Sequence, residues 1–293
     1  MLNHIQLTKS ISNLIFSVQA GSKDLIDKSY FGGAMAFRQR IAMMLEATLR
    51  TTVSLRSTKL AATVVETVAM FKIGCEHGQT EWFNNVMTKT YGTVPRLEIK
   101  DTSIETPGET EIITGDVVSV SLELTRLHAE AFTRQKVAMF QKQGIPPQIG
   151  LQTYREGWWF IVSGKRHEGD GDLSKALSIN TEGVLQKCDE QDLEEFRALP
   201  LQQRLITAWP MMVANVAQKS GKVKIQFRVP KVPGKYTFKV DVMSQEFLDA
   251  DQSFEVTATI VDQSSVDREP REAQAPTQAQ QAPAKSQESK KDE

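Results

Sequence analysis

The sequence is poor in the residues on which many enzyme sites depend. It has only two cysteines in 293 residues, Cys75 and Cys188, which are far apart. One disulfide is arithmetically possible, but no disulfide framework or paired-cysteine motif is present, so a reducing compartment is favoured. The four histidines are scattered among different predicted elements: His4, His77, His128 and His167. Little therefore points to metal- or thiol-dependent chemistry.

Long apolar runs and an excess of charge are also missing. The longest apolar stretch, Leu60 to Ile73, is interrupted by polar residues, whereas a membrane span needs about 20 mostly apolar residues. The N-terminus lacks the basic start and continuous apolar run of a secretory signal. With 35 basic and 36 acidic residues the net charge is −1. This balance gives no global attraction for nucleic acid or anionic lipid, although local patches remain possible.

No motif with the spacing of a catalytic or ligand-binding site is found. Gly164-Lys165 lacks the glycine spacing and the following Ser or Thr of a nucleotide loop. Cys75-Glu76-His77 matches no common metal or nucleophile site and is better explained as a helix end. Glu168–Asp172 begins like a calcium loop but lacks the distal glutamate, so an exposed turn is favoured. We predict no catalytic, cofactor or metal residues, no small-molecule substrate, and a protein that is not an enzyme.

Residues 1–92 have the apolar periodicity of a helical bundle. Apolar side chains recur every three or four residues, which is typical of helices that pack against one another. Three such stripes are present: Phe37, Ile41, Leu45, Leu49 and Val53, widened by Met44 and Thr48; Leu60, Val64, Val65, Val68 and Phe71; and Trp82, Phe83, Val86 and Met87. Core packing between neighbouring helices is the expected role of all three.

After Pro95 the period changes to the alternation of half-buried strands. It is found in 116–125, 223–229, 236–242 and 254–260, and the run 157–162 is typical of a buried central strand. Pro233-Gly234 suits a turn between two of these strands. Repeated short strands with one apolar face predict an antiparallel sandwich, here assigned to residues 93–262.

Two insertions interrupt the predicted sandwich, and a tail follows it. The first insertion, near 129–153, contains a helix from Ala129 to Gln143 that ends at Gly144 before Pro146-Pro147. The second, near 186–221, contains an acidic and helical segment, 189–204. Residues 263–293 are rich in Pro, Ala, Gln, Ser and charges, so they cannot bury enough apolar surface to offset their ordering entropy. We predict a disordered tail.

A row of basic residues is expected on the outer faces of the last strands. If these side chains share one face, they could contact phosphates or an acidic partner. Without interleaved exposed aromatic residues, a solvated sheet face is the favoured interpretation and nucleic acid is an improbable partner. The residues are Lys222, Lys224, Arg228, Lys235 and Lys239.

The C-terminal third carries a series of strings that resembles a known family. Val223–Phe227, Val229-Pro230 and Pro233–Tyr236 precede the string Val242–Gln252. In this order they resemble the Sec sixty-three domain, in which a helical bundle is followed by a fibronectin-type-III-like sandwich. Gly115–Val120, Leu124–Arg126 and Trp158-Trp159 also fit its earlier strands. Asp249 stands where the family often has Gly, and Asp tolerates positive φ better than most residues.

The resemblance implies a fold class and a function. The fold would be α+β, an N-terminal helical bundle followed by an immunoglobulin- or fibronectin-type-III-like antiparallel β-sandwich with helical insertions. The function would be that of a non-catalytic cytosolic scaffold of the endoplasmic-reticulum Sec translocon, docked on the protein-conducting channel during post-translational import. The alternative within the same family is a regulatory C-terminal unit of a Ski-two-like RNA helicase.

The chain departs from both family settings. It has no predicted transmembrane helix, no His-Pro-Asp of a J-domain and no helicase motor. A fragment of a larger polypeptide or a shortened relative is expected, located at the cytosolic face of the endoplasmic-reticulum membrane. Membrane contact would come through partners or through missing N-terminal spans.

Loops at the ends of a sandwich are natural contact surfaces, and two of them are our candidates. The first is the turn at Lys231–Lys235, and the second is the connection Glu246–Asp251. The alternative for both is an ordinary hairpin connection, with Phe247 and Leu248 plugging the end of the sandwich. The partner-binding candidates are Lys231, Lys235, Glu246, Phe247, Leu248, Asp249 and Asp251.

Overall fold

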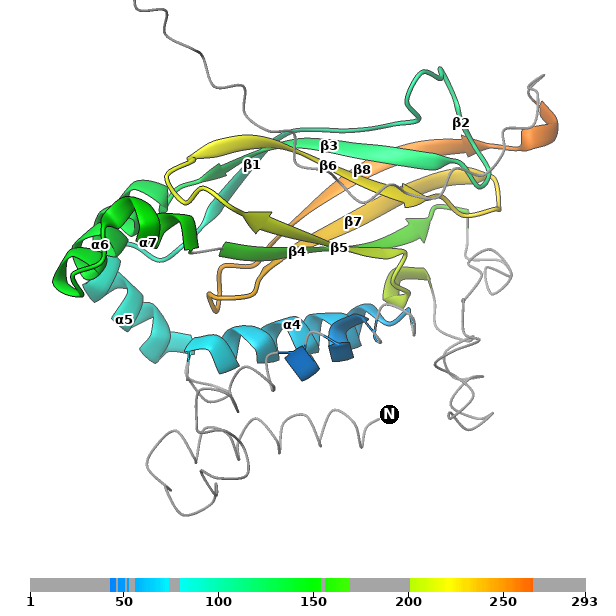
Figure 1. Ribbon diagram of the computed structural model, residues 1–293. Coiled ribbons are helices and arrows are strands. Elements are labelled where there is room, and N and C mark those ends of the chain that lie inside the picture. Colours follow the sequence, from blue (N-terminus) through cyan, green and yellow to red (C-terminus); the bar gives the residue numbers. More distant parts are fainter. Residues whose placement is uncertain are drawn as a thin grey trace, which may run out of the picture.

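The protein combines helices and two β-sheets in an α+β arrangement (Figure 1). The computed structural model describes residues 43–45, 47–50, 52, 56–73, 80–153, 156–168 and 201–265. The named helices are α4 (Thr58–Ile73), α5 (Thr80–Tyr91), α6 (Ala129–Lys142) and α7 (Pro147–Thr153), with two 3₁₀ turns, η4 (Leu201–Gln203) and η5 (Gln263–Ser265). The strands are β1 (Leu97–Glu105), β2 (Ile112–Ile113), β3 (Val117–Arg126), β4 (Glu156–Arg166), β5 (Thr207–Val213), β6 (Ser220–Arg228), β7 (Gly234–Ser244) and β8 (Gln252–Val261).

The strands form a three-stranded sheet in the order β1-β3-β6 and a five-stranded sheet in the order β2-β8-β7-β4-β5. Every pairing is antiparallel except that of β2, whose two residues run parallel to the end of β8. The predicted antiparallel pairing is thus found for all the longer strands, and the short edge strand β2 departs from it. The five predicted strands correspond to β3, β4, β6, β7 and β8.

One apolar core lies between the two sheets and continues under α4. Val118, Val120 and Leu122 of β3 point into it from one sheet, and Phe238 and Val240 of β7 from the other. The rings of Phe227 and Phe238 meet across the gap, with centroids 5.2 Å apart. Burial of alternate residues on facing sheets explains why β3, β6, β7 and β8 show a period of two.

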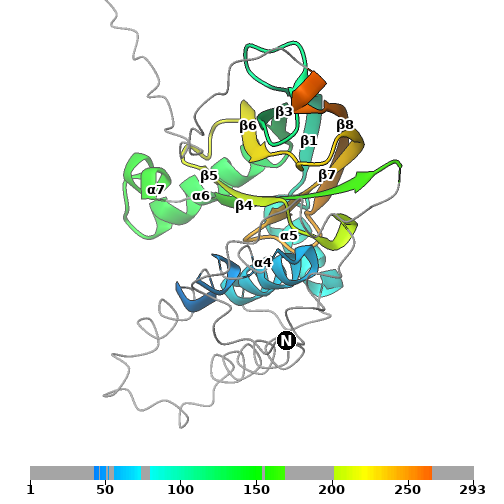
Figure 2. The ribbon, with the colours of Figure 1, turned by 90° about the vertical axis from the view of Figure 1, so that its right-hand side faces the viewer.

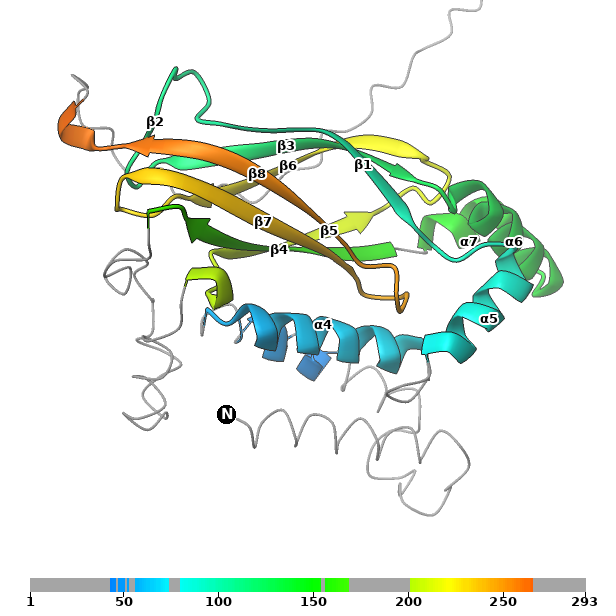
Figure 3. The ribbon, with the colours of Figure 1, turned by 180° about the vertical axis from the view of Figure 1, so that it is seen from behind.

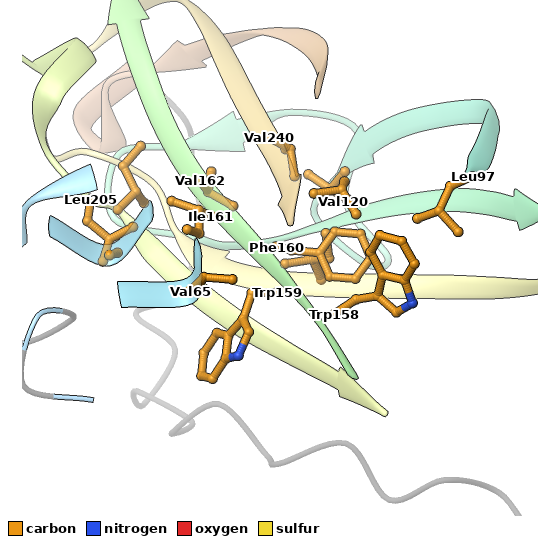
Figure 4. Packing of buried hydrophobic residues seen from close by; sticks show 14 of the residues in the cluster. Val65, Leu97, Val120, Trp158, Trp159, Phe160, Ile161, Val162, Leu205 and Val240 are labelled. Carbon is orange, nitrogen blue, oxygen red and sulfur yellow. The ribbon is translucent and has the colours of Figure 1, made fainter. Parts of the chain in front are cut away.

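Strand β4 is buried on both faces, as its continuous apolar sequence predicts. Figure 4 shows Trp158, Phe160 and Val162 on the side of Val120, and Trp159 and Ile161 on the side of Val65. The second face is covered by α4, which lies along the five-stranded sheet (Figure 3). A strand placed between a second sheet and a helix has no solvent side, so alternation is lost.

Three strands were not predicted. The strand β2 has only two residues, too few to show a period, and β1 and β5 are each hidden for a local reason. In β1 the register shifts between Lys100 and Ser103, where Asp101 has a φ of 49°. This bulge moves the apolar side from odd to even positions and hides the alternation. In β5, Pro210 interrupts a run without period, and the strand lies at a sheet edge, where Pro is tolerated. The predicted second insertion therefore includes a sheet strand at 207–213, and β6 begins within it at Ser220.

The helical stripes are only partly core. In α4, Leu60, Val64, Val65 and Val68 are buried, as expected. In α5, Phe83 and Met87 are buried, whereas Trp82 is 53% exposed and Val86 37% exposed. The expected packing of the latter two is therefore wrong. So is the core position of Met44, which is 61% exposed.

Several predictions lie outside the described residues. These are the bundle before residue 43, Cys75-Glu76-His77, Cys188, most of 168–200, and 266–293. The first three residues of the predicted tail form η5. Within the described part of the chain, no helix has the length and apolar character needed to span a bilayer.

Candidate functional site

The predicted contact residues lie at opposite ends of the sheets. Lys231 and Lys235 precede or begin β7, whereas Glu246–Asp251 follows it. Ten steps of strand separate the two groups by roughly 33 Å at about 3.3 Å per residue. We call the end that contains Ser244–Asp251 the covered end, because α5 and α6 lie beside it, and the end that contains Lys231–Lys235 the open end (Figure 1). The fold therefore separates the candidates into two sites, one at each end of the sheets.

The loop from Ser244 to Asp251 is closed by its own polar side chains. The Ser244 hydroxyl accepts hydrogen bonds from the backbone N–H groups of Glu246 and Phe247, both at 3.0 Å. Asp251 Oδ1 accepts from the Ser244 N–H at 3.1 Å. Asp249 has a φ of 59°, so the expectation that this position needs positive φ is confirmed. The string that carries the family resemblance is therefore also the string that shapes this loop.

Phe247 and Leu248 turn inward and are buried, 5% and 7% exposed. The Phe247 ring packs edge-on against Phe132, with centroids 5.0 Å apart, and against His128 at 5.6 Å. Trp158 lies at 6.4 Å. In this conformation neither side chain is available to a partner. The packing supports the alternative interpretation, in which they plug the end of the core.

A buried polar network lies directly beneath this plug. Glu156, Arg126 and His128 are 0%, 2% and 0% exposed. Arg126 pairs with Glu156 through two parallel hydrogen bonds, from Nε and Nη2. Arg126 Nη1 donates to the carbonyls of Val216 and Gln218 at 2.9 and 2.8 Å. The network therefore joins β3, β4 and the β5–β6 connection across the two sheets.

Glu156 is held as a carboxylate by the groups around it. Burial alone would raise its pKa, but hydrogen bonds and charge from His128 and Arg126 outweigh burial and lower the pKa from 4.5 to about 2. The indole of Trp158 donates to Oε1 at 2.8 Å, and His128 Nε2 lies 3.2 Å from both oxygens. Because a carboxylate only accepts, Nε2 carries the proton.

The network has the chemistry of a structural ion pair. Its carboxylate is saturated with donors, and none of its three ionisable side chains reaches solvent. His128 Nδ1 faces the backbone of Arg96, 3.1 Å from its carbonyl and 3.3 Å from its N–H, which anchors the start of β1. Charged groups sealed from water in this way position neighbouring elements, here α6 and the Ser244–Asp251 loop, and offer no access to a substrate.

The surface above the plug is acidic. Asp249 and Asp251 are exposed, and Glu66 of α4 and Asp241 of β7 lie near enough to act on Asp251. Asp251 retains an exposed surface, yet protein atoms crowd its carboxyl. This desolvation, with repulsion from the three neighbouring carboxylates, raises the pKa to about 6 against the opposing Ser244 hydrogen bond. Glu246 is set apart from this group, since its charge acts on Lys136 and Tyr91.

The open end is held by fewer and more exposed contacts. Lys231 and Lys235 are exposed. Arg166 donates from Nη2 to the carbonyl of Pro233 at 2.8 Å, and the Tyr236 hydroxyl donates to that of Val232 at 2.7 Å. The β6–β7 connection is thus fixed in shape, and its two lysines remain free to contact a partner.

The predicted basic row is divided between the two sheets. Lys222, Lys224 and Arg228 are exposed on β6 of the three-stranded sheet, whereas Lys235 and Lys239 are exposed on β7 of the five-stranded sheet. Lys222 is also paired in register with Glu123. The five cations therefore form no single face, which removes the geometric basis for a phosphate-binding stripe.

Sequence reasoning did not single out the buried network. One signal was present, because Glu156 immediately precedes the buried run 157–162, where an unpaired charge would be costly. Its partners could not be found, since Arg126 and His128 lie 30 and 28 residues away. Among the described residues, no group of three His, Cys, Asp or Glu side chains is arranged to hold a metal ion.

Comparison with known proteins assigns no family. No family model matches the chain, and no curated protein matches it. Similar solved structures include a CARDB domain from Pyrococcus furiosus, 8% identical, with a TM-score of 0.26, over 57% of this chain and 90% of that one. A β-glucosidase from Erythrobacter marinus is 8% identical, with a TM-score of 0.25, over 57% of this chain and 16% of that one. TM-scores this low carry no argument about fold family or function.

Proposed function

We propose that this chain is a non-catalytic scaffold of the Sec translocon at the cytosolic face of the endoplasmic reticulum, built on a fibronectin-type-III-like sandwich. Its sheets would dock on cytosolic loops of the protein-conducting channel. By contacting the open channel better than the closed one, the scaffold would shift the population toward opening during import. The acidic surface at the covered end, formed by Asp249, Asp251 and Glu66, is the observation that carries this proposal.

Charge complementarity supports docking through this surface. Cytosolic loops of membrane proteins carry an excess of Lys and Arg. The carboxylates around Asp251 already repel one another, and a cationic loop would relieve that repulsion. The buried network and the Phe247 plug hold the loop in one shape, so little ordering entropy would be lost on binding.

The resemblance strings agree with this proposal in their placement. They fall on β3, β4, β6, β7 and the β7–β8 loop, in the chain order that the family has. Gln252, which ends the last string, donates from Nε2 to the Leu97 carbonyl at 2.6 Å, linking the two sheets. The residues of the last string thus have structural roles at the covered end, next to the surface proposed to dock.

Co-purification from mild detergent tests the proposal. The tagged protein is expected to recover the channel subunits, and Asp249→Asn with Asp251→Asn to reduce that recovery by at least about threefold, since each exposed charge contributes modestly. Asn retains the acceptor for the Ser244 N–H and tolerates positive φ. Lys222→Gln with Lys224→Gln is the matched control, with two exposed charges removed from β6 and recovery unchanged.

The pH dependence gives a second measurement. A cationic partner would lower the pKa of Asp251 below its free value of about 6, so binding is linked to proton release. Affinity should be highest above pH 6 and fall as the pH drops through 6. Recovery of helicase or ribonucleoprotein components without channel subunits would overturn the translocon proposal and favour the helicase unit.

A further inference from the structure

The helical hairpin formed by α6 and α7 presents apolar side chains to solvent at its tip. Ile145, in the turn, is 38% exposed, Ile149 of α7 is 57% exposed, and Met139 of α6 is 36% exposed. Figure 2 shows α6 and α7 projecting to one side of the sheets. A projecting apolar tip of this kind marks a contact surface when the apolar side chains are gathered and rigidly held.

The turn is rigid. Gly144, with a φ of 69°, ends α6, and its N–H donates to the Gln141 carbonyl at 3.1 Å. The Ile145 N–H donates to the Phe140 carbonyl at 2.9 Å, which completes a closed helix end. Gly150 lies so close to the Phe140 ring that a Cβ there would stand 2.4 Å from it. The two helices are thus locked together, and Ile145 and Ile149 stay exposed because the backbone fixes them.

The hairpin also departs from the charge balance of the chain. From Ala131 to Thr153 the sequence has three basic residues and no acidic one, although the whole chain has 35 basic and 36 acidic residues. Lys136 is half-buried over the Phe132 ring, whereas Arg134 and Lys142 are exposed. Neither exposed cation forms an ion pair with the described residues. The nearest acidic residue in sequence, Glu130, is 3.2 Å from Lys219.

We propose that the tip of this hairpin inserts into the interface of an anionic membrane, with Ile145 and Ile149 among the acyl chains and Arg134 and Lys142 at the headgroups. Aliphatic side chains on a projecting turn, with exposed cations on the same hairpin that form no ion pair with the described residues, fit a deformable anionic surface. A protein interface would more typically present aromatic anchors, and the exposed apolar residues of the tip are aliphatic or Met. This contact does not depend on the proposed function, because it needs no channel.

Vesicle flotation with the purified chain tests the inference. Binding to vesicles of phosphatidylcholine with about a third phosphatidylserine is expected to exceed binding to phosphatidylcholine alone by about tenfold or more, since each cation near such a surface contributes about fivefold. Ile145→Ser with Ile149→Ser should lower binding by at least about tenfold. Arg134→Gln with Lys142→Gln should remove the preference for the anionic lipid.

A matched variant separates this site from general charge. Lys222→Gln with Lys224→Gln removes two exposed cations from β6 and should leave vesicle binding unchanged. Because all the substituted side chains are exposed, thermal unfolding should be unaltered and will show that each variant is folded. Three outcomes would overturn the inference. The β6 and hairpin variants could lose vesicle binding equally, the unchanged chain could fail to bind vesicles, or the isoleucine variants could keep vesicle binding and lose only a protein partner. Channel recovery in co-purification is independent of each of these outcomes.

Discussion

The two ends of the sheets are built from the same strands but are stabilised differently. At the covered end a saturated ion pair, a histidine and an aromatic plug are all buried, with Glu156 and Phe247 at 0% and 5% exposed. At the open end the connection is held by Arg166 and Tyr236 bonded to backbone carbonyls, beside exposed lysines. Burial makes each polar contact at the covered end more important for stability, because a buried group that loses its hydrogen-bond partner cannot form a hydrogen bond with water instead.

Removing the buried carboxylate should give the largest difference between the ends. Glu156→Gln leaves Arg126 as a buried charge with a weakened partner, so we expect a loss of about 3–5 kcal/mol in the free energy of unfolding, measured with urea. Arg166→Gln, the corresponding change at the open end, should cost no more than about 1.5 kcal/mol.

A double variant sharpens this prediction. Arg126→Met with Glu156→Leu removes both charges and should recover much of the stability that Glu156→Gln loses. Equal costs for Glu156→Gln and Arg166→Gln would show that the two ends do not differ in the way proposed.

The same carboxylate should make the covered end sensitive to acid. The folded pKa of Glu156, about 2, lies below its usual 4.5, so its contribution is complete above pH 4.5 and is lost as the pH falls toward 2. The loss amounts to about 3 kcal/mol at roughly 1.4 kcal/mol per pH unit. Asp251 acts in the opposite direction, because its raised pKa makes stability increase as the pH falls through 6.

Urea unfolding between pH 2 and pH 7 would measure both effects. The acid loss should be absent in Glu156→Gln, and the gain below pH 6 should be absent in Asp251→Asn. A wild-type profile that stays flat between pH 4.5 and pH 2 would contradict the role given to the ion pair.

Truncating the plug should also distinguish the two ends. Phe247→Ala removes a ring that contacts Phe132, His128 and Trp158, so we expect a loss of about 3 kcal/mol. Val232→Ala, at a half-buried position of the open end, should cost about 1 kcal/mol or less. Thermal unfolding of the two variants compares them directly, and a costlier Val232→Ala would reverse the comparison.

The backbone of the covered end gives the smallest effect. Asp249 has positive φ, so Asp249→Val should cost about 1–2 kcal/mol, whereas Asp249→Asn should be nearly neutral. Glu255→Val, at an exposed position of β8, is the control for adding the same side chain to a residue in extended conformation. Equal stabilities of the two valine variants would show that this loop carries no conformational constraint.

Much of the architecture was predictable because it depends on local periods. The strands β3, β6, β7 and β8 were visible as alternation, and α6 as a helix ending at Gly144. The strands β1 and β5 were not, because a bulge at Asp101 and a proline at 210 hide their period, and the third missed strand, β2, has only two residues. The burial of side chains on α5 was partly predicted wrongly for a similar reason. The sequence shows that Trp82 and Phe83 are both apolar, but it does not show which of them is buried.

The candidate site was likewise predictable only in its local features. The sequence located the Ser244–Asp251 loop and a residue at 249 that tolerates positive φ, but it left open whether Phe247 and Leu248 contact a partner or plug the end of the sandwich. Only packing against α6 shows that they are buried, because the contacts of Phe247 lie more than a hundred residues away in the chain, at His128 and Phe132.

By itself, the sequence determined most of the helices and strands, the turn chemistry, and the absence of any recognisable catalytic motif, all of which depend on neighbours within a few residues. The tertiary structure decided the rest: that Arg126, His128 and Glu156 form one buried network, that the basic row is split between two sheets, and that the contact candidates occupy opposite ends. Such facts depend on which strands become neighbours, and strand pairing is set by long-range burial that no local pattern records.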